Sequence, residues 1–307
     1  MKENSSKKIL TIVLILSGLF IISLFTAMIF SFALFGESLP KSGNVALIPL
    51  KGVITTDGQD LGWGESGVSS TEIVEFIEEV EKDDQIKAIV FEIDSPGGSA
   101  VASKEIADAI RSTKKPTVAV IRELGASGAY WSASATDHII ADELSITGSI
   151  GVLSSYLEFS GLMEKYGVKY QQLTAGKYKD SGSPFKSLSL EEELMFQSKI
   201  DKIHQVFIYS VAQNRKIDPI KVKQIADGNF YLGMEAKELG LVDELGNKKS
   251  AEIYLKQKYN LTEITYVEYE HEDSLFEIFS ELKNQNSFFV GKGIASQFTN
   301  QKVSIRT

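Results

Sequence analysis

A serine among small residues, directly after an apolar stretch, is the first candidate for chemistry. Ser127 lies in GASGAYW (125–131) and follows segment 117–121, whose β-branched residues predict a short buried strand. Small residues continue to Ala135 and predict a closely packed helix. At such a junction, unpaired backbone N–H groups and the helix dipole stabilise the negative charge that a serine nucleophile develops. A serine that only caps the helix produces the same local pattern.

Histidine is the usual base for a serine nucleophile, but no histidine here is well placed. His138 follows Ser127 too closely to reach back easily, and His204 lies on a predicted helix without a nearby acid. Ala129 also replaces the second glycine of the G-x-S-x-G elbow. A Ser-His-Asp triad is therefore not expected. The absence of cysteine excludes disulfides, thiolate catalysis and cysteine-based metal sites.

Lysine is the other known partner for serine, provided that its pKa falls from about 10.4 toward roughly 7–8 so that it becomes neutral. Lys177 and Lys179 lie in GKYKD (176–180), after a predicted strand over 168–173. The segment is not a P-loop, because Tyr178 stands where the motif needs serine or threonine. Two exposed loop lysines would give the same pattern.

Two glycine-containing turns are further candidates. DSPGG (94–98) ends a predicted strand over 86–93, and its glycines can present backbone N–H groups. TGS (147–149) supplies hydroxyls that can position a lysine. Ordinary turns explain both equally well.

The N-terminus predicts a membrane anchor. Residues 9–35 are uncharged and rich in Leu, Ile and Phe, and they exceed the ~20 residues that a bilayer requires. Lysines precede them, so residues 1–8 are expected in the cytoplasm and the chain after the linker 36–43 outside it. A cleaved signal peptide is the alternative, but the apolar run exceeds the usual ~7–15 residues and no clear cleavage site ends it.

The rest of the chain alternates strands and helices. Residues 44–260 are therefore expected to form one α/β domain with a parallel sheet, followed by an extension over 261–307. The net charge of −9 and the lack of a basic stripe exclude nucleic acid as an expected partner. Further predicted elements are helices over 71–79, 99–111, 161–166, 191–214 and 274–283, and strands over 138–141 and 262–269. The buried side of the helix over 191–214 is predicted to include Leu194, Ile200, Ile203, Phe207 and Val211.

Together these segments resemble the signal peptide peptidase A family of membrane serine peptidases (peptidase family S49), in its short single-domain form. The resemblance covers most of residues 44–250. Its four motifs, behind one N-terminal apolar segment, are DSPGG (94–98), ASGAYW (126–131), TGSIGV (147–152) and YKD (178–180). The resemblance implies the Clp-protease/crotonase-like α/β fold of repeated β-β-α units, preceded by one transmembrane helix. Ala129 departs from the family, which more often has glycine there.

The resemblance also implies roles for five residues. Ser127 matches the nucleophile and Lys179 the general base, while Ser149 matches a hydroxyl that orients the lysine. The backbone N–H groups of Gly98 and Gly128 match the oxyanion hole. No metal or cofactor is implied.

The implied function is a membrane-anchored serine endopeptidase with a Ser–Lys dyad, acting on remnant signal peptides and other small or misfolded peptides. Family members form ring-like oligomers in which neighbouring subunits complete the site, so a homo-oligomer is expected. The alternatives are a related Ser–Lys protease that cleaves a membrane-protein partner, a crotonase-type acyl-CoA enzyme, and a non-catalytic membrane-anchored scaffold. Coenzyme A is not expected outside the cytoplasm.

Overall fold

The computed structural model describes residues 3–35, 43–58 and 67–270. Residues 42–270 form one compact unit, and helix α1 (Glu3–Phe35) belongs to a separate unit. Within these described ranges, no helix is both long enough and apolar enough to cross a membrane. The anchor over residues 9–35 stays a prediction. The helix predicted over 274–283 lies outside the described residues.

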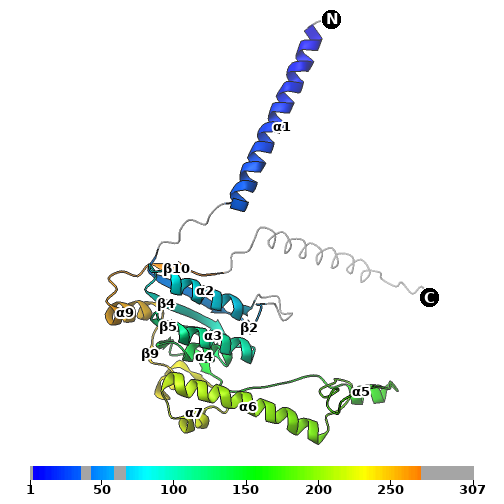
Figure 1. Ribbon diagram of the computed structural model, residues 1–307, viewed down its shortest axis with the longest axis vertical. Coiled ribbons are helices and arrows are strands. Elements are labelled where there is room, and N and C mark those ends of the chain that lie inside the picture. The colour runs from blue at the N-terminus through cyan, green and yellow to red at the C-terminus, as the bar shows by residue number, and fades with distance from the viewer. Residues whose placement is uncertain (1–2, 36–42, 59–66, 271–307) are drawn as a thin grey trace, which may run out of the picture. The chain divides into compact units, whose positions relative to one another are not determined.

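A parallel sheet forms the centre of the compact unit (Figure 1). Its strands lie in the order β10 (Tyr266–Glu268), β1 (Val45–Lys51), β4 (Ala88–Ser95), β5 (Thr117–Ala126), β6 (His138–Ala141) and β9 (Glu244–Leu245), all parallel to their neighbours. β7 (Ile146–Gly148) pairs parallel with the end of β5 and antiparallel with β8 (Phe230–Leu232). β2 (Ile54–Thr55) and β3 (Val68–Ser69) form a separate parallel pair. The predicted α/β class with a parallel-rich sheet is confirmed, and β10 carries the unit past residue 260.

Helices cover both faces of this sheet because side chains alternate along buried parallel strands. On β1, Ala46, Ile48 and Leu50 join the larger core, whereas Val45 and Leu47 join the smaller one. The larger core contains residues of α2 (Ser70–Lys82), α3 (Ala100–Ser112), α4 (Gly128–Ser134), α6 (Leu190–Arg215), α7 (Pro219–Ile225) and α8 (Gly233–Glu238). The smaller core lies under α9 (Lys248–Tyr259).

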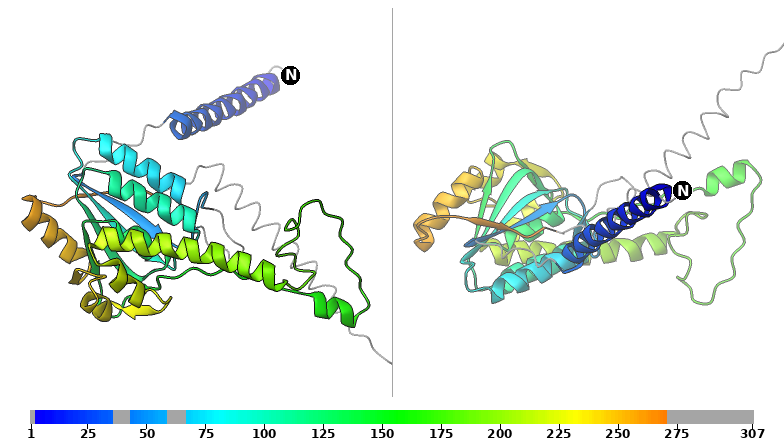
Figure 2. Two further views of the ribbon diagram at one scale, coloured as in Figure 1. Left: turned by 60° about the horizontal axis from the view of Figure 1, so that its bottom comes forward. Right: turned by 90° about the horizontal axis from the view of Figure 1, so that it is seen from above.

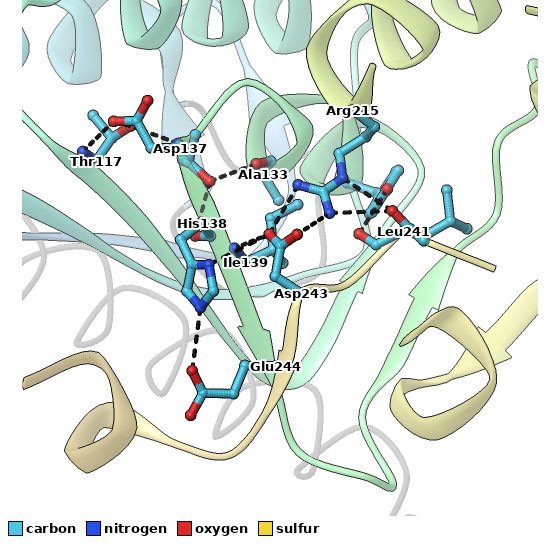
Figure 3. A network of polar contacts seen from close by, with 12 residues as sticks. Thr117, Ala133, Asp137, His138, Ile139, Arg215, Leu241, Asp243 and Glu244 are labelled. Atoms are coloured by element: carbon cyan, nitrogen blue, oxygen red, sulfur yellow. Dashed lines mark hydrogen bonds and ion pairs between the residues drawn. The ribbon is translucent and has the colours of Figure 1, made fainter. Parts of the chain in front are cut away.

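The C-terminal end of α6 is fixed to the sheet by an ion pair (Figure 3). The Arg215 guanidinium donates hydrogen bonds of 2.9 and 2.6 Å to Asp243 and of 3.3 and 3.1 Å to the Gly240 carbonyl. Asp243 also accepts a 2.8 Å bond from the backbone N–H of Ile139 in β6. His138, at the start of the same strand, lies 3.2 Å from the Glu244 carboxylate.

Between β7 and α6 the chain leaves the sheet. Residues 153–200, here called the extension, comprise the short helix α5 (Ser160–Lys165), its flanking loops and the first part of α6 (Figures 1 and 2). The strand predicted over 168–173 is wrong, because these residues are exposed and pair with no strand of the described chain. The predicted buried side of α6 is also wrong at its N-terminal half. Leu194 and Ile203 are exposed, whereas Phe207 and Val211 are buried.

Strand β7 ends at Gly148. Gly148 and Ser149 have φ values of 75° and 51°, which interrupt the extended backbone. The chain therefore turns away from β5 at this point.

Candidate active site

Ser127 lies at the junction of β5 and α4 in a strained backbone conformation. Its φ is 53° and its ψ −123°, a combination that residues with a side chain rarely adopt. The Ser127 N–H donates a 2.8 Å hydrogen bond to the Gly148 carbonyl, and the Ser127 carbonyl accepts a 3.0 Å bond from the Trp131 N–H. The hydroxyl makes no capping bond to α4. Helix capping therefore does not explain this serine, and its hydroxyl is available for chemistry.

Two backbone N–H groups, those of Gly98 and Gly128, lie close to Ser127, and the backbone of Gly97 allows this close approach. Gly97 has φ +91°, and a Cβ built on it would lie 2.5 Å from the Gly128 nitrogen and 3.0 Å from the Ser127 Cβ. Gly98 forms a parallel bridge with Ile54, in which the Ile54 N–H donates to the Gly97 carbonyl and the Ser99 N–H donates to the Ile54 carbonyl. The N–H of Gly98 is not used in this bridge and points away from Ile54. Gly128 is the first residue of α4, where an N–H has no acceptor within the helix. Such a pair of N–H groups is suited to bind an oxyanion.

The turn after β7 supports this junction. Ser149 is half-buried, and its N–H donates a 2.9 Å bond to the Asn229 carbonyl, while its hydroxyl lies 3.4 Å from the Gly228 carbonyl. The Thr147 hydroxyl donates a 2.8 Å bond to the Gly125 carbonyl on β5. The turn that carries Ser149 is thereby held beside the strand that ends in Ser127.

A cleft of about 700 Å³ brings four of the predicted site residues together, namely Gly98, Ser127, Gly128 and Ser149. The wall that α6 contributes to this cleft was missed in the sequence. Phe207 stacks on Trp131 with ring centroids 4.4 Å apart, and both rings line the cleft. His204 lines it too and donates from Nε2 to the Ile150 carbonyl oxygen at 3.1 Å. The apolar spacing along the predicted helix indicated that Phe207 is buried, but it could not show that this side chain packs against Trp131.

Comparison with known proteins identifies the family. Residues 66–138 match the Clp protease family, and residues 109–262, about half of the chain, match peptidase family S49. The chain is 37% identical to a putative protease of Methanocaldococcus jannaschii over 225 aligned residues. The aligned region covers 72% of this chain and 71% of that protein. The chain belongs to peptidase family S49.

Two further relatives agree with this assignment. Over 76% of its length, this S49 peptidase is 33% identical to a putative signal peptide peptidase SppA of Enterococcus faecium, 68% of which is covered. It is 29% identical over 73% of its length to Protease 4 of Haemophilus influenzae, of which it spans 36%. The protein is therefore a serine protease, and its parallel-rich α/β architecture is consistent with the Clp protease fold.

The remaining predicted site residue of this S49 peptidase, Lys179, does not line the cleft within a single chain. It is exposed in a turn of the extension. Lys177, two residues earlier, lies 2.6 Å from a carboxylate oxygen of Glu191. Hydrogen bonds with Glu191 and then Tyr178 raise the pKa of Lys177 and favour its protonated form, which cannot act as a base.

Proposed function

We propose that this S49 peptidase is a Ser–Lys endopeptidase in which Lys179 of one copy serves Ser127 of another. The observation that carries the proposal is the junction at Ser127, where an uncapped hydroxyl on strained backbone adjoins two backbone N–H groups in a cleft. The part of the extension around α5 projects away from the sheet (Figures 1 and 2), and Lys179 does not line the cleft of its own chain, so a second copy is the natural recipient.

Exposed apolar side chains on the extension support association with a second copy. A soluble surface rarely leaves many large apolar groups in contact with water unless they form an interface. Leu173 is 94% exposed and Leu157 73%. Others on the same segment are Leu153, Leu162, Tyr166, Val168, Leu190 and Leu194.

In the proposed mechanism, neutral Lys179 accepts the proton of the Ser127 hydroxyl while Oγ attacks a peptide carbonyl. The N–H groups of Gly98 and Gly128 hold the tetrahedral oxyanion. The lysine then gives its proton to the leaving amine, which departs and leaves an acyl-enzyme. Water, deprotonated by the lysine, hydrolyses this ester and restores Ser127. Ser149 would orient the lysine amine through its hydroxyl.

The proposed substrates are peptides with small or apolar side chains, such as remnants of signal peptides. The Trp131–Phe207 stack supports this choice, because it gives the cleft an apolar wall. The proposed setting is a membrane, with residues 9–35 as a single anchor and the peptidase unit outside the cytoplasm. The long uncharged run behind lysines at positions 2, 7 and 8 supports this topology.

The dyad is tested with the full chain in detergent and a short leader-like peptide. Ser127→Ala and Lys179→Ala should each lower kcat/KM by roughly 10³-fold or more. Co-expression of the two inactive variants should restore about a quarter of the activity, because one site in four then combines an intact serine with an intact lysine from another copy. If both variants are inactive and their co-expression restores no activity, sharing of the site between copies is refuted. An active Lys179→Ala would refute the dyad.

The topology is tested by introducing single cysteines, which the cysteine-free chain permits. A membrane-impermeant thiol reagent added to intact cells should label Lys256→Cys, an exposed position on α9, and not Ser5→Cys. The reverse pattern would place the peptidase unit in the cytoplasm.

A further inference from the structure

The carboxylate of Glu192 is the centre of a hydrogen-bond cluster at the N-terminal end of α6. Although it belongs to the exposed extension, Glu192 is only 7% exposed. Its Oε1 accepts 2.9 Å bonds from the Lys186 amine and the Ser181 hydroxyl. Its Oε2 accepts 2.9 Å bonds from the backbone N–H and the hydroxyl of Ser189, which completes a capping box. Of these four bonds a capping box needs only the one from the Ser189 N–H, which it combines with a 3.3 Å bond from the Glu192 N–H to the Ser189 hydroxyl. The bonds from Ser181 and Lys186 are not part of the cap.

The other two bonds reach the turn that carries Lys179. Ser181 follows Lys179 by two residues and is held directly by Glu192. Asp180, the next residue after Lys179, has Oδ2 3.5 Å from the Lys186 amine and accepts a 3.2 Å bond from the Tyr170 hydroxyl at Oδ1. Lys186 therefore bridges Asp180 and Glu192. Both residues that follow Lys179 are tied to the start of α6.

Three lysines lie in or near the turn that this cluster holds, and they differ in their partners. Lys177 is paired with Glu191, and Lys186 with Asp180 and Glu192. Across the ranges that the structure describes, Lys179 has no carboxylate within ion-pairing distance. A carboxylate partner favours the charged ammonium, and both Lys177 and Lys186 have one. Of these three lysines, Lys179 is therefore the one whose amine is not engaged by a carboxylate of the described chain.

We propose that Glu192 is a positioning residue that, through Ser181, Lys186 and Asp180, fixes the turn presenting Lys179 to the serine of another copy. The inference rests on the proposed function, because it needs Lys179 to be the base. Its physical basis is that proton transfer requires the two heavy atoms within about 3 Å, so a misplaced lysine loses rate even when substrate binding is intact.

The first test compares two neighbouring glutamates in the full chain. Glu192→Gln should lower kcat by about 10–100-fold and leave KM within about threefold, since a misplacement of about 1 Å can cost 10²-fold. Glu191 is unsuited as the control, because it accepts a hydrogen bond from Tyr178, the residue before Lys179. The matched control is Glu193→Gln, at an exposed side chain without an ion pair in the described residues, and it should change kcat by less than about threefold. Oligomer size and circular dichroism are recorded for both. Equal effects of the two substitutions, or a change confined to KM, would overturn the proposal.

The second test separates positioning of the lysine from general damage to the extension. Glu192→Gln is added either to the Ser127→Ala chain, which supplies the lysine, or to the Lys179→Ala chain, which supplies the serine. Each double variant is co-expressed with the other inactive single variant. The recovered activity should fall in the first mixture and persist in the second. Equal loss in both mixtures would show a structural role only.

The proposal and the proposed function fail in different ways. Full activity of Lys179→Ala would overturn both. An inactive Lys179→Ala with wild-type kcat in Glu192→Gln would overturn only the role of Glu192. If Ser127→Ala and Lys179→Ala do not complement, sharing between copies is refuted, and the comparison of Glu192→Gln with Glu193→Gln decides the role of Glu192 by itself.

Discussion

Helix α6 carries an ion pair at each end, and the two ends differ in their surroundings. At the C-terminal end, the Arg215 side chain is 7% exposed and packs into the body beside β6 (Figure 3). Burial alone would raise the pKa of Asp243, but the hydrogen bonds and charge of Arg215 lower it below its ordinary value. The pair is thus part of the same buried structure as the sheet.

At the N-terminal end, the carboxylate of Glu192 is covered by its own hydrogen-bond partners rather than by a hydrophobic core. Bonds from Lys186, then from Ser189 and Ser181, lower the pKa of Glu192 to about 2. Neighbouring apolar side chains such as Leu190 and Leu194 are exposed. The cluster therefore orders its own turn and contributes little to the core.

The difference assigns separate tasks to the two ends of one helix. The Arg215 pair should control whether the unit is folded, because a charge left alone in a buried site destabilises the whole fold. The Glu192 cluster should control how the extension presents Lys179, with small effects on global unfolding. The following predictions test this division.

The largest expected effect on stability is at the buried end. Arg215→Met should lower the free energy of unfolding by about 2–4 kcal/mol, because it leaves the Asp243 carboxylate without its cation. Urea denaturation followed by circular dichroism measures the change. Arg215→Met combined with Asp243→Asn should recover part of the loss, since no charge is then left unpaired. A loss below about 1 kcal/mol in the single variant would mean that the Arg215–Asp243 pair contributes no more to stability than an exposed ion pair does.

Much of the fold could be predicted because local patterns and burial agree there. The β-branched segment 117–121 became the start of β5, and the predicted helices over 71–79 and 99–111 became α2 and α3. The strand over 168–173 failed because alternation predicts a strand only where another strand is available to pair with it. Leu194 was misplaced for a related reason, since periodicity shows an apolar stripe but not which surface covers it.

The candidate site was predictable where neighbouring residues in sequence define it. Ser127, Gly128 and Gly98 lie at ends of adjacent strands and meet because β4 and β5 are paired. The α6 wall at Phe207 and His204 depends on a distant helix crossing this edge, which no local spacing reveals. The cluster at Glu192 did leave a signal, because Ser189 followed three residues later by Glu192 is a capping-box pattern.

An intermediate effect is expected when the exposed cluster is acidified. The pKa of Glu192 is about 2 in the folded chain and 4.5 for an ordinary glutamate, so the cluster's stabilisation is complete above pH 4.5 and is lost as the pH falls toward 2. Cleavage by pepsin within residues 176–189 should therefore rise over this range in the wild type. Glu192→Gln should be cleaved readily throughout, after correction with a reference peptide. Equal cleavage of both proteins at pH 4.5 would show that Glu192 does not order the turn.

The smallest effect is expected at Lys177, which shares the extension with Glu192 but lies in an exposed ion pair. Lys177→Met should leave the urea midpoint of unfolding almost unchanged, because solvent screens an exposed pair. It should also leave kcat/KM within about threefold, since Glu191 keeps Lys177 protonated and unsuited to accept a proton. Peptide hydrolysis by Lys177→Met and Lys179→Ala, measured side by side, checks this. An inactive Lys177→Met beside an active Lys179→Ala would move the base to Lys177 and reverse the order of importance of the two lysines.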